Sequence, residues 1–436
     1  MALADLLSFR EVTIGLFTFL VFAALAFVYQ RKRRLPAFDA QLLFWGLIAR
    51  LLSGIAFAMA HVFVLARSDS FRYYQCITDM WEAWWESPQM GLEQFWAEAG
   101  SQVLPLEVYF AHWSTLTVIK AGTLVSLLTF NSYWALTFSF GTFAFGGLWA
   151  MFRGFCRIFP QYKKVLGISL IFFPSVLFWG SGLMKDPLVL GLLGWWVYSW
   201  LNLIVFQRRF WISVLILLVT TLLIAIIKVY ILYGLLIATL VMLMVWGWKQ
   251  WVHLPILWLY GMGTALVCLI ILTTPDLGFR FVIHQQWHVE QVALRNPFSY
   301  YSLGDISGGW SGILPKIPPA IWVSFFRPYP WETDISAMSL YALESFLLLG
   351  ITIWLVGRMV VSRNWTRLFR NTVWTFCWSF SLSVATVLGL YTYSFGTMAR
   401  YRILILPLYC VLLLFIYTST QKENPGISEN FPAENG

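Results

Sequence analysis

Uncharged apolar segments recur along the whole chain, and they restrict its possible folds more than any other feature. Two of them, 165–179 and 188–206, flank the sequence Gly-Ser-Gly-Leu-Met-Lys-Asp-Pro. A segment of about 20 apolar residues is long enough for a helix to cross a bilayer. Charged residues make up only 11% of the chain, whereas an average soluble domain has about 25%. We therefore predict an all-α fold, a polytopic bundle of transmembrane helices.

The positions of the basic residues predict the topology. Cytoplasmic loops carry an excess of Lys and Arg, so we expect every basic cluster inside: 31–34, 153–164, 208–209, 249, 358–370 and 422. This arrangement predicts about eleven spans, with the N-terminus outside and the C-terminus inside. The predicted spans are 12–30, 40–65, 132–152, 165–183, 188–206, 210–227, 229–248, 253–273, 339–357, 371–391 and 403–420.

The predicted organisation is a single integral-membrane domain, residues 1–420. A first external loop covers 67–107, and a large external loop covers 274–338, before the last three spans. The first apolar run is followed by basic residues and is interpreted as a retained anchor. The tail, 421–436, is polar and is expected to be disordered.

Two segments are expected to lie along the membrane surface. In residues 79–99, indoles alternate with carboxylates at helical spacing, and Glu82 and Glu86 are four residues apart. This pattern is typical of an amphipathic interfacial helix. Residues 108–130 are apolar enough to span, but a crossing there would place the basic cluster at 153–164 outside. We interpret 108–130 as re-entrant or interfacial.

Composition argues against several classes of function. The net charge of +9 is explained by cytoplasmic loop residues, so no nucleic-acid partner is predicted. The five cysteines form no CxxC pair, which argues against a disulfide framework or a metal cluster. The 25 tryptophans favour aromatic belts at the two membrane surfaces.

Asp69 is the candidate catalytic residue. It lies within a few residues of the external end of the second predicted span, in the sequence Arg-Ser-Asp-Ser-Phe-Arg-Tyr-Tyr. A carboxylate there can be partly desolvated and still reach an aqueous substrate, which raises its proton affinity and suits a general base. The alternative is a solvated aspartate beside Arg67 and Arg72. Tyr74, in the same segment, is a candidate substrate-binding residue.

Three charged residues lie in short external connections. Lys185 and Asp186 separate two predicted spans, and Lys228 separates the next pair. A lysine beside the lipid surface suits a phosphate or pyrophosphate group. Asp186 can alternatively act as the N-cap of a helix with Pro187 in its first turn. All three are candidate substrate-binding residues, and Lys185 is the one that capping does not explain.

The end of the large external loop supplies three further candidates for substrate binding. Prolines in the sequence Phe-Arg-Pro-Tyr-Pro-Trp-Glu fix the backbone, so that Arg327 and Glu332 are held at the membrane edge. An arginine placed there suits a bidentate phosphate contact. Glu344 lies inside the following span and needs a partner, for which Arg327 and Arg400 are the candidates.

The last short external connection, 392–402, contains arginines, although the positive-inside tendency favours such residues in cytoplasmic loops. Arg400 and Arg402 both lie there, which favours a functional use, and Arg400 is a candidate substrate-binding residue. Arg50 and Lys120 lie within apolar stretches and could snorkel to the membrane surface.

These features resemble the GT-C superfamily of integral-membrane glycosyltransferases. The resemblance rests on the first-loop Asp69, the amphipathic segment after it, the large external loop and the basic residues at external mouths. The segments 174–186 and 326–332 also resemble uncharacterised bacterial envelope proteins. The chain differs from the family because Asp69 follows the second predicted span and because a paired Asp-Asp or Asp-Glu is absent.

The resemblance implies a glycosyltransferase in the bacterial cytoplasmic (inner) membrane, working at its external, periplasmic face. The donor would be a sugar on polyprenyl phosphate, and the acceptor a glycan or a lipid. Asp69 would deprotonate the acceptor, while Lys185, Arg327 and Arg400 would hold the lipid phosphate. No cofactor is expected, and a divalent metal is not indicated.

Two alternatives remain open at the level of sequence. One is an envelope polysaccharide polymerase or ligase with a polyprenyl-pyrophosphate donor, which would use external arginines and His284 or His288. Those two histidines are four residues apart, but no third ligand or HExxH motif supports zinc. The other alternative is a transporter of lipid-linked glycans, although no internal repeat is visible. A purely structural partner in an envelope complex is a further possibility.

Overall fold

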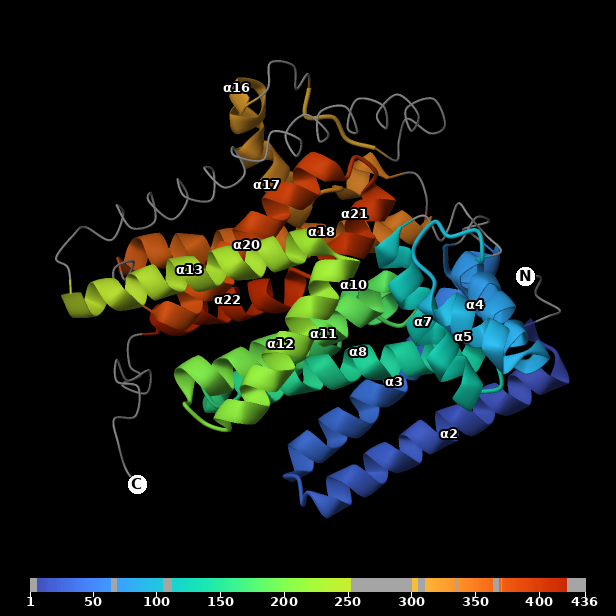
Figure 1. Ribbon diagram of the computed structural model, residues 1–436. Helices are drawn as coiled ribbons and strands as arrows, with labels where there is room; N and C mark the ends of the chain where they lie inside the picture. The colour runs from blue at the N-terminus through green and yellow to red at the C-terminus, as the bar shows by residue number, and fades with distance from the viewer. Residues whose placement is uncertain are drawn as a thin grey trace. The chain divides into compact units, whose positions relative to one another are not determined.

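The computed structural model describes residues 6–63, 69–104, 112–251, 300–304, 310–333, 336–363, 368–369 and 371–421. These residues form helices (Figure 1). The described residues also contain one isolated antiparallel bridge, between Tyr300 and Ser394. They group into two compact units, 1–229 and 230–436. We describe each unit by itself.

Seven of the described helices are long and apolar enough to cross a membrane, and a bent pair could add an eighth. The all-α membrane prediction is thereby confirmed, whereas the count of about eleven spans is not. The predicted span 253–273 lies outside the described residues. The seven are α2 (Phe9–Lys32), α3 (Ala37–Phe63), α8 (Tyr133–Phe155), α11 (Lys185–Trp200, continued by η2, Leu201–Val205), α12 (Phe210–Ile227), α18 (Ser336–Ser362) and α20 (Thr372–Tyr391).

In unit 1, α8 and α11 pack closely because glycines line their contact. A methyl group added to Gly147 would lie 2.1 Å from the carbonyl oxygen of Gly191, and one added to Gly194 would meet the backbone of Gly147. Small residues let the backbones of membrane helices approach, which increases their van der Waals contact. The α8–α11 pair forms the centre of unit 1.

The segment predicted to span at 165–183 is a broken helix, which corrects the expected hairpin of two regular spans. It consists of η1 (Pro160–Tyr162), α9 (Lys163–Ile171) and α10 (Pro174–Trp179), followed by irregular residues up to α11. The break before α10 has a physical cause, since Pro174 lacks an N–H donor and disfavours a helical conformation for the residue before it.

The broken segment runs beside α3 along most of that helix. Gly167 packs against Leu42, and Gly182 lies against the ring of Phe57. A methyl group at Gly182 would come within 2.2 Å of that ring, so the chain passes there only because residue 182 is glycine.

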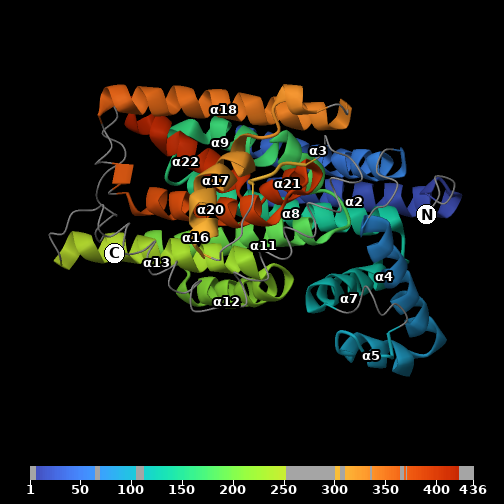
Figure 2. The ribbon, with the colours of Figure 1, turned by 90° about the horizontal axis from the view of Figure 1, so that it is seen from above.

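Three further helices of unit 1 lie together at one end of it. They are α4 (Asp69–Glu86), α5 (Pro88–Trp96) and α7 (Trp113–Leu128), and Figure 2 shows α4 leading away from α2, α3 and α8 with α5 and α7 beside it. The expected amphipathic helices are confirmed as helices. The 108–130 segment contains α7, an apolar helix of 16 residues that is shorter than the spanning ones.

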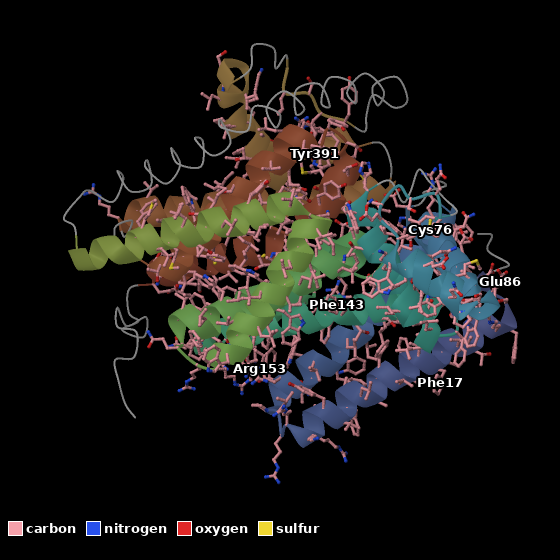
Figure 3. The ribbon with its side chains drawn as sticks, viewed as in Figure 1. Phe17, Cys76, Glu86, Phe143, Arg153 and Tyr391 are labelled. Carbon is pink, nitrogen blue, oxygen red and sulfur yellow. The ribbon has the colours of Figure 1, made fainter. Side chains whose placement is uncertain are left out.

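The basic cluster 153–164 lies at the opposite end of unit 1 (Figure 3). Figure 3 shows Arg153 at one end of this unit and Cys76 and Glu86 at the other. Lys163 binds Asp39 at 2.6 Å, and Arg157 donates to Asn202 at 2.8 Å.

In unit 2, α20 packs against α17 (Ile317–Phe326), α22 (Leu406–Ser419) and the short α21 (Phe395–Arg402), and α18 packs against α17 and α22. α13 (Val229–Trp251) precedes the undescribed residues 252–299. The minor elements are α16 (Trp310–Ile313), η4 (Leu314–Lys316) and η5 (Pro330–Glu332). The predicted span 403–420 corresponds to α22, which is bent by 67° from α21.

Candidate functional site

Lys185 is held by hydroxyl groups from another helix. It is the first residue of α11, and its Nζ donates to Ser114 Oγ and to Thr115 Oγ1, both at 2.9 Å. Ser114 and Thr115 belong to the first turn of α7. The N-terminus of α7 therefore lies next to the N-terminus of α11, with the ammonium group of Lys185 between them.

This arrangement is chemically suited to an anion. Neither helix has a side-chain cap, because His112 before α7 and Met184 before α11 make no capping hydrogen bond. Helix N-termini present free N–H groups and a partial positive charge, both of which favour phosphate. The two hydroxyls accept hydrogen bonds from Lys185 and keep their own O–H groups as donors.

Asp186 and Lys228 form a buried ion pair within unit 1. The side chain of Asp186 has no exposed surface, and that of Lys228 is 6% exposed. Asp186 was expected at the N-cap, but that position is Met184, and Asp186 lies in the first turn of the helix. Because the two charges compensate each other away from water, their evident role is to join the start of α11 to the α12–α13 junction.

Asp69 is the first residue of α4 and therefore lies directly after the connection that leaves α3. Its neighbour Ser70 hydrogen bonds with the hydroxyl of Tyr133 at 2.9 Å. The hydroxyl of Tyr74 donates to the carbonyl oxygen of Asn131 at 2.8 Å. Tyr74 thus joins α4 to the α7–α8 turn.

Two other groups on α4 have shifted acid–base behaviour. Burial and the nearby charge of Glu82 raise the pKa of the Asp79 carboxyl above its usual range. Burial, with a smaller contribution from Asp79, raises the pKa of the Cys76 thiol to about 12. Cys76 is consequently a neutral packing residue at physiological pH rather than a reactive thiolate.

In unit 2, Arg327 binds Glu332 through a bidentate contact. Arg327 Nε donates to Oε2 at 3.0 Å and Nη2 donates to Oε1 at 2.5 Å. Glu332 Oε2 also accepts from the backbone N–H of Tyr329 at 2.9 Å. The prolines do hold both residues in one short segment, as expected, but the two side chains bind each other.

Glu344 pairs with Arg402, whereas the expected partners were Arg327 and Arg400. Arg402 Nη2 donates to Glu344 Oε1 at 2.5 Å, and Nη1 donates to Ser345 Oγ and to the carbonyl oxygen of Phe325. Arg402 has no exposed surface. The sequence could not distinguish Arg400 from Arg402, because the packing of α21 decides which of the two is buried.

The remaining groups at this end of unit 2 have ordinary packing roles. Arg400 lies over the ring of Tyr401, with 5.4 Å from the guanidinium carbon to the ring centroid. The hydroxyl of Tyr301 donates to the carbonyl oxygen of Gly389 at 2.9 Å and contacts Thr392. Burial raises the pKa of Tyr301 well above its usual range, so this phenol stays neutral.

The two cations predicted to snorkel behave differently from each other. Lys120 lies in α7, where its Nζ donates to the carbonyl oxygen of Ala97 at 3.0 Å and lies 5.8 Å from the ring centroid of Phe95. Arg50, near the middle of α3, does not snorkel. Its side chain is fully buried, and Nη1 donates to the carbonyl oxygens of Val176 at 2.7 Å and Leu177 at 3.2 Å.

The predicted site residues are therefore divided between the two units. Asp69, Tyr74, Lys185, Asp186 and Lys228 belong to unit 1, and Arg327, Glu332, Glu344 and Arg400 belong to unit 2. His284 and His288 lie outside the described residues. In the part of the chain that the structure describes, no three His, Cys, Asp or Glu side chains are grouped as a metal site.

Sequence reasoning missed Ser114 and Thr115. The signal that could have revealed them is the polar pair at the start of an otherwise apolar run, since Ser and Thr are common in the first turn of helices. Their contact with Lys185 joins positions about 70 residues apart, which no local pattern predicts.

Comparisons with known proteins leave the family open. No family model matches the chain, and neither a curated protein nor a solved structure is similar to it.

Proposed function

We propose that this protein is a membrane glycosyltransferase that takes a sugar from a polyprenyl-phosphate donor and transfers it to a glycan or lipid acceptor at the external face. The observation that supports this most is the Lys185 site in unit 1. An ammonium group, two hydroxyls and two uncapped helix N-termini meet there. Together they supply the donors that a phosphate group requires.

In this proposal, the leaving group is the lipid phosphate. As the bond between the sugar and the phosphate oxygen breaks, negative charge increases on the phosphate. Lys185 and the O–H groups of Ser114 and Thr115 are already in place to stabilise it, so little reorganisation is needed. The positive charge at that step is supplied by the ammonium group.

The helices around the site suit a substrate that is itself a lipid. α4 carries exposed Trp85, and α5 ends at exposed Trp96, while α7 exposes Trp113 at its start. Indole rings prefer the headgroup region of a bilayer. A site beside such helices would receive the phosphate of a lipid whose chain remains in the membrane.

Asp69 is proposed as the base that accepts a proton from the acceptor hydroxyl. It begins α4, and the same helix is fastened to the α7–α8 turn through Ser70 and Tyr74. Because α7 also carries Ser114 and Thr115, Asp69 and the phosphate site lie on helices that pack together in unit 1. Asp69→Asn should abolish transfer and leave donor binding intact.

Binding of a polyprenyl phosphate tests the proposal directly. The purified protein in nanodiscs would be titrated with decaprenyl phosphate, and bound lipid counted by native mass spectrometry. Lys185→Gln should weaken binding at least tenfold, because a hydrogen bond to a charged group contributes about 1.5 to 3 kcal/mol. Lys164→Gln, at the basic end of the same unit, is the matched control and should leave binding unchanged.

The result that would overturn this proposal is equal binding by the Lys185→Gln variant and the unaltered protein. Transfer itself would then be tested with decaprenyl-phosphate-linked sugars, measured as release of decaprenyl phosphate. Release in the unaltered protein and none in Asp69→Asn would support the assignment of the base.

One observation favours transport of a lipid-linked glycan as a second candidate. Transporters commonly bind substrate where a membrane helix is interrupted and an ionisable group lies near mid-membrane, and α10 with Arg50 fits that description. Proteoliposomes loaded with a fluorescent lipid-linked sugar distinguish the two functions. Movement across the bilayer without release of lipid phosphate would favour the transporter.

A further inference from the structure

Half of the Arg50 guanidinium is buried without a hydrogen-bond partner among the described residues. Nη1 binds two carbonyl oxygens of α10, but Nε and Nη2 donate to no described residue. In the planar guanidinium, Nε–H and Nη2–H lie along one edge and point in the same direction. Within the described part of the chain, one complete two-donor edge of Arg50 therefore has no acceptor.

Arg327 in unit 2 shows what this edge binds when it is occupied. There the same two nitrogens, Nε and Nη2, hold the two carboxylate oxygens of Glu332 at 3.0 and 2.5 Å. Such a fork matches the spacing of two oxygens in a carboxylate or a phosphate group. The Nε–Nη2 edge of Arg50 has the same chemistry.

The positive charge of Arg50 also lacks a negative partner among the described residues of unit 1. Three acidic side chains are buried in this part of the unit, and each has another partner: Glu11 binds Ser132, Asp39 binds Lys163 and Asp186 binds Lys228. An uncompensated charge inside a membrane span is costly, and such residues commonly mark a ligand site or a pathway.

Small and polar residues surround this guanidinium. A methyl group added to Gly141 would lie 3.5 Å from Arg50 Cγ, and one added to Gly180 would lie 2.3 Å from Nη1. Ser53 and Ser181 both donate their hydroxyl hydrogen to the carbonyl oxygen of Leu177, at 3.1 and 2.6 Å. Four residues close to Arg50, namely Ser53, Gly141, Gly180 and Ser181, are therefore small or polar.

We propose that the Nε–Nη2 edge of Arg50 binds an oxyanion, a carboxylate or a phosphate group, inside the membrane-spanning part of unit 1. Because the side chain has no exposed surface, the ligand enters when α10 shifts. α10 has six residues and irregular backbone on both sides, so few helical hydrogen bonds hold it in place. The anion is either a small soluble one or the headgroup of an anionic lipid.

The experiment measures thermal unfolding of the full-length protein in nanodiscs with and without anions. One arm adds inorganic phosphate or acetate at constant ionic strength to phosphatidylcholine nanodiscs. The other arm replaces about a tenth of the phosphatidylcholine with phosphatidic acid. A ligand at about 100 times its Kd should raise the Tm by about 5 °C, and the arm that shows the shift identifies the source.

Variants assign the shift to Arg50. Both Arg50 variants are made in a Lys185→Gln background, so that the Lys185 site contributes no shift. Arg50→Lys keeps the charge but lacks the two-donor edge, so it should lose most of the remaining shift, and Arg50→Gln should lose all of it. Ser139→Ala is the matched control, because the Ser139 hydroxyl donates to the carbonyl oxygen of Ala135 in its own helix, α8, and the substitution leaves the guanidinium intact. A full shift in Arg50→Gln, or no shift in either arm with the unaltered protein, would overturn the proposal.

A further variant separates this site from the phosphate site proposed above. Lys185→Gln should leave the anion-induced shift in place, because Arg50 does not depend on Lys185. If both Arg50 variants fail to fold, phosphate binding to Lys185→Gln is measured by equilibrium dialysis or, for phosphatidic acid, by native mass spectrometry. One bound anion per chain then supports the Arg50 site, and none overturns it.

Discussion

Arg402 and Arg50 are both fully buried arginines on membrane helices, yet their surroundings differ. In unit 2, Arg402 binds the carboxylate of Glu344, the hydroxyl of Ser345 and a backbone carbonyl, and Tyr341 covers its guanidinium carbon at 4.2 Å. In unit 1, Arg50 binds two backbone carbonyls of a broken helix and no carboxylate of the described residues. The first arginine has its charge compensated by the protein, and the second does not.

The comparison shows how a buried charge can be sorted into a structural or a ligand-binding role. A charge paired with a carboxylate keeps helices in register and has little capacity left for a substrate. A charge held by carbonyls or hydroxyls keeps an affinity for an anion. By this criterion Arg402 is structural, while Arg50 is a candidate for binding an anion.

The largest expected effect is on the stability of unit 2. Arg402→Met removes one partner of a buried ion pair and leaves Glu344 without its arginine in an apolar setting. The variant should lose about 3 to 5 kcal/mol of unfolding free energy, measured by denaturant or thermal unfolding in detergent micelles. The double variant Arg402→Met/Glu344→Leu should recover much of the loss, and a single variant as stable as the parent would contradict the structural role.

A smaller loss is expected for Arg50→Met in the same assay without added anion. No carboxylate among the described residues loses its partner. The two carbonyl oxygens that Arg50 binds also keep other donors: Leu177 accepts from Ser53 and Ser181, and Val176 accepts from the backbone N–H of Gly180. We expect about 1.5 to 3 kcal/mol, the contribution of a hydrogen bond to a charged group. A loss equal to that of Arg402→Met would erase the contrast between the two arginines.

Ser114→Ala tests the hydroxyl contribution to the Lys185 site. One neutral hydrogen bond contributes about 0.5 to 1.5 kcal/mol, so affinity for decaprenyl phosphate should fall about two- to tenfold while stability changes little. Thr117→Ala is the control, because Thr117 lies one turn further along α7 and bonds its own helix at Trp113. Equal effects of the two variants would remove Ser114 from the site.

The smallest expected effect concerns pH and Asp79. Its pKa is raised in the folded protein, so the folded state binds more protons than the unfolded state just above the ordinary carboxyl pKa. The contribution of this group to stability should therefore decrease as pH rises from about 4 toward neutral. Asp79→Asn should reduce this dependence, as seen in Tm measured across that range.

Glu82→Gln is the companion test. Its charge contributes to the raised pKa of Asp79, so removing it should shift the pH dependence toward lower pH without abolishing it. An unchanged pH profile in both variants would show that Asp79 does not couple to unfolding.

Much of the fold could be predicted because membrane insertion depends on local composition. Apolar segments identified α2, α3, α8, α12, α18 and α20 within a few residues of their observed bounds. Alternating indoles and carboxylates predicted a helix in residues 79–99, where the structure has the end of α4 and the separate helix α5. The break within 163–184 was harder to predict, because its mean composition is as apolar as that of a regular span.

The residue types at the candidate sites were also visible in the sequence, and their partners were not. Lys185 and Arg50 stood out as charges in or beside apolar stretches, because ionised groups are rare there. Their contacts, to α7 and α10 respectively, join residues separated by 70 or more positions. Glu344 was assigned the wrong arginine for the same reason.

The sequence by itself determined that this chain is a helical membrane protein, since the hydrophobic effect acts on local composition. Only the tertiary structure decided which buried charges neutralise one another. Which charges meet depends on how closely the helices approach one another. In unit 1, that approach depends on glycines such as Gly182 and on the helix break at Pro174. Charges compensated within the fold hold helices together, and those that are not remain available for an anion.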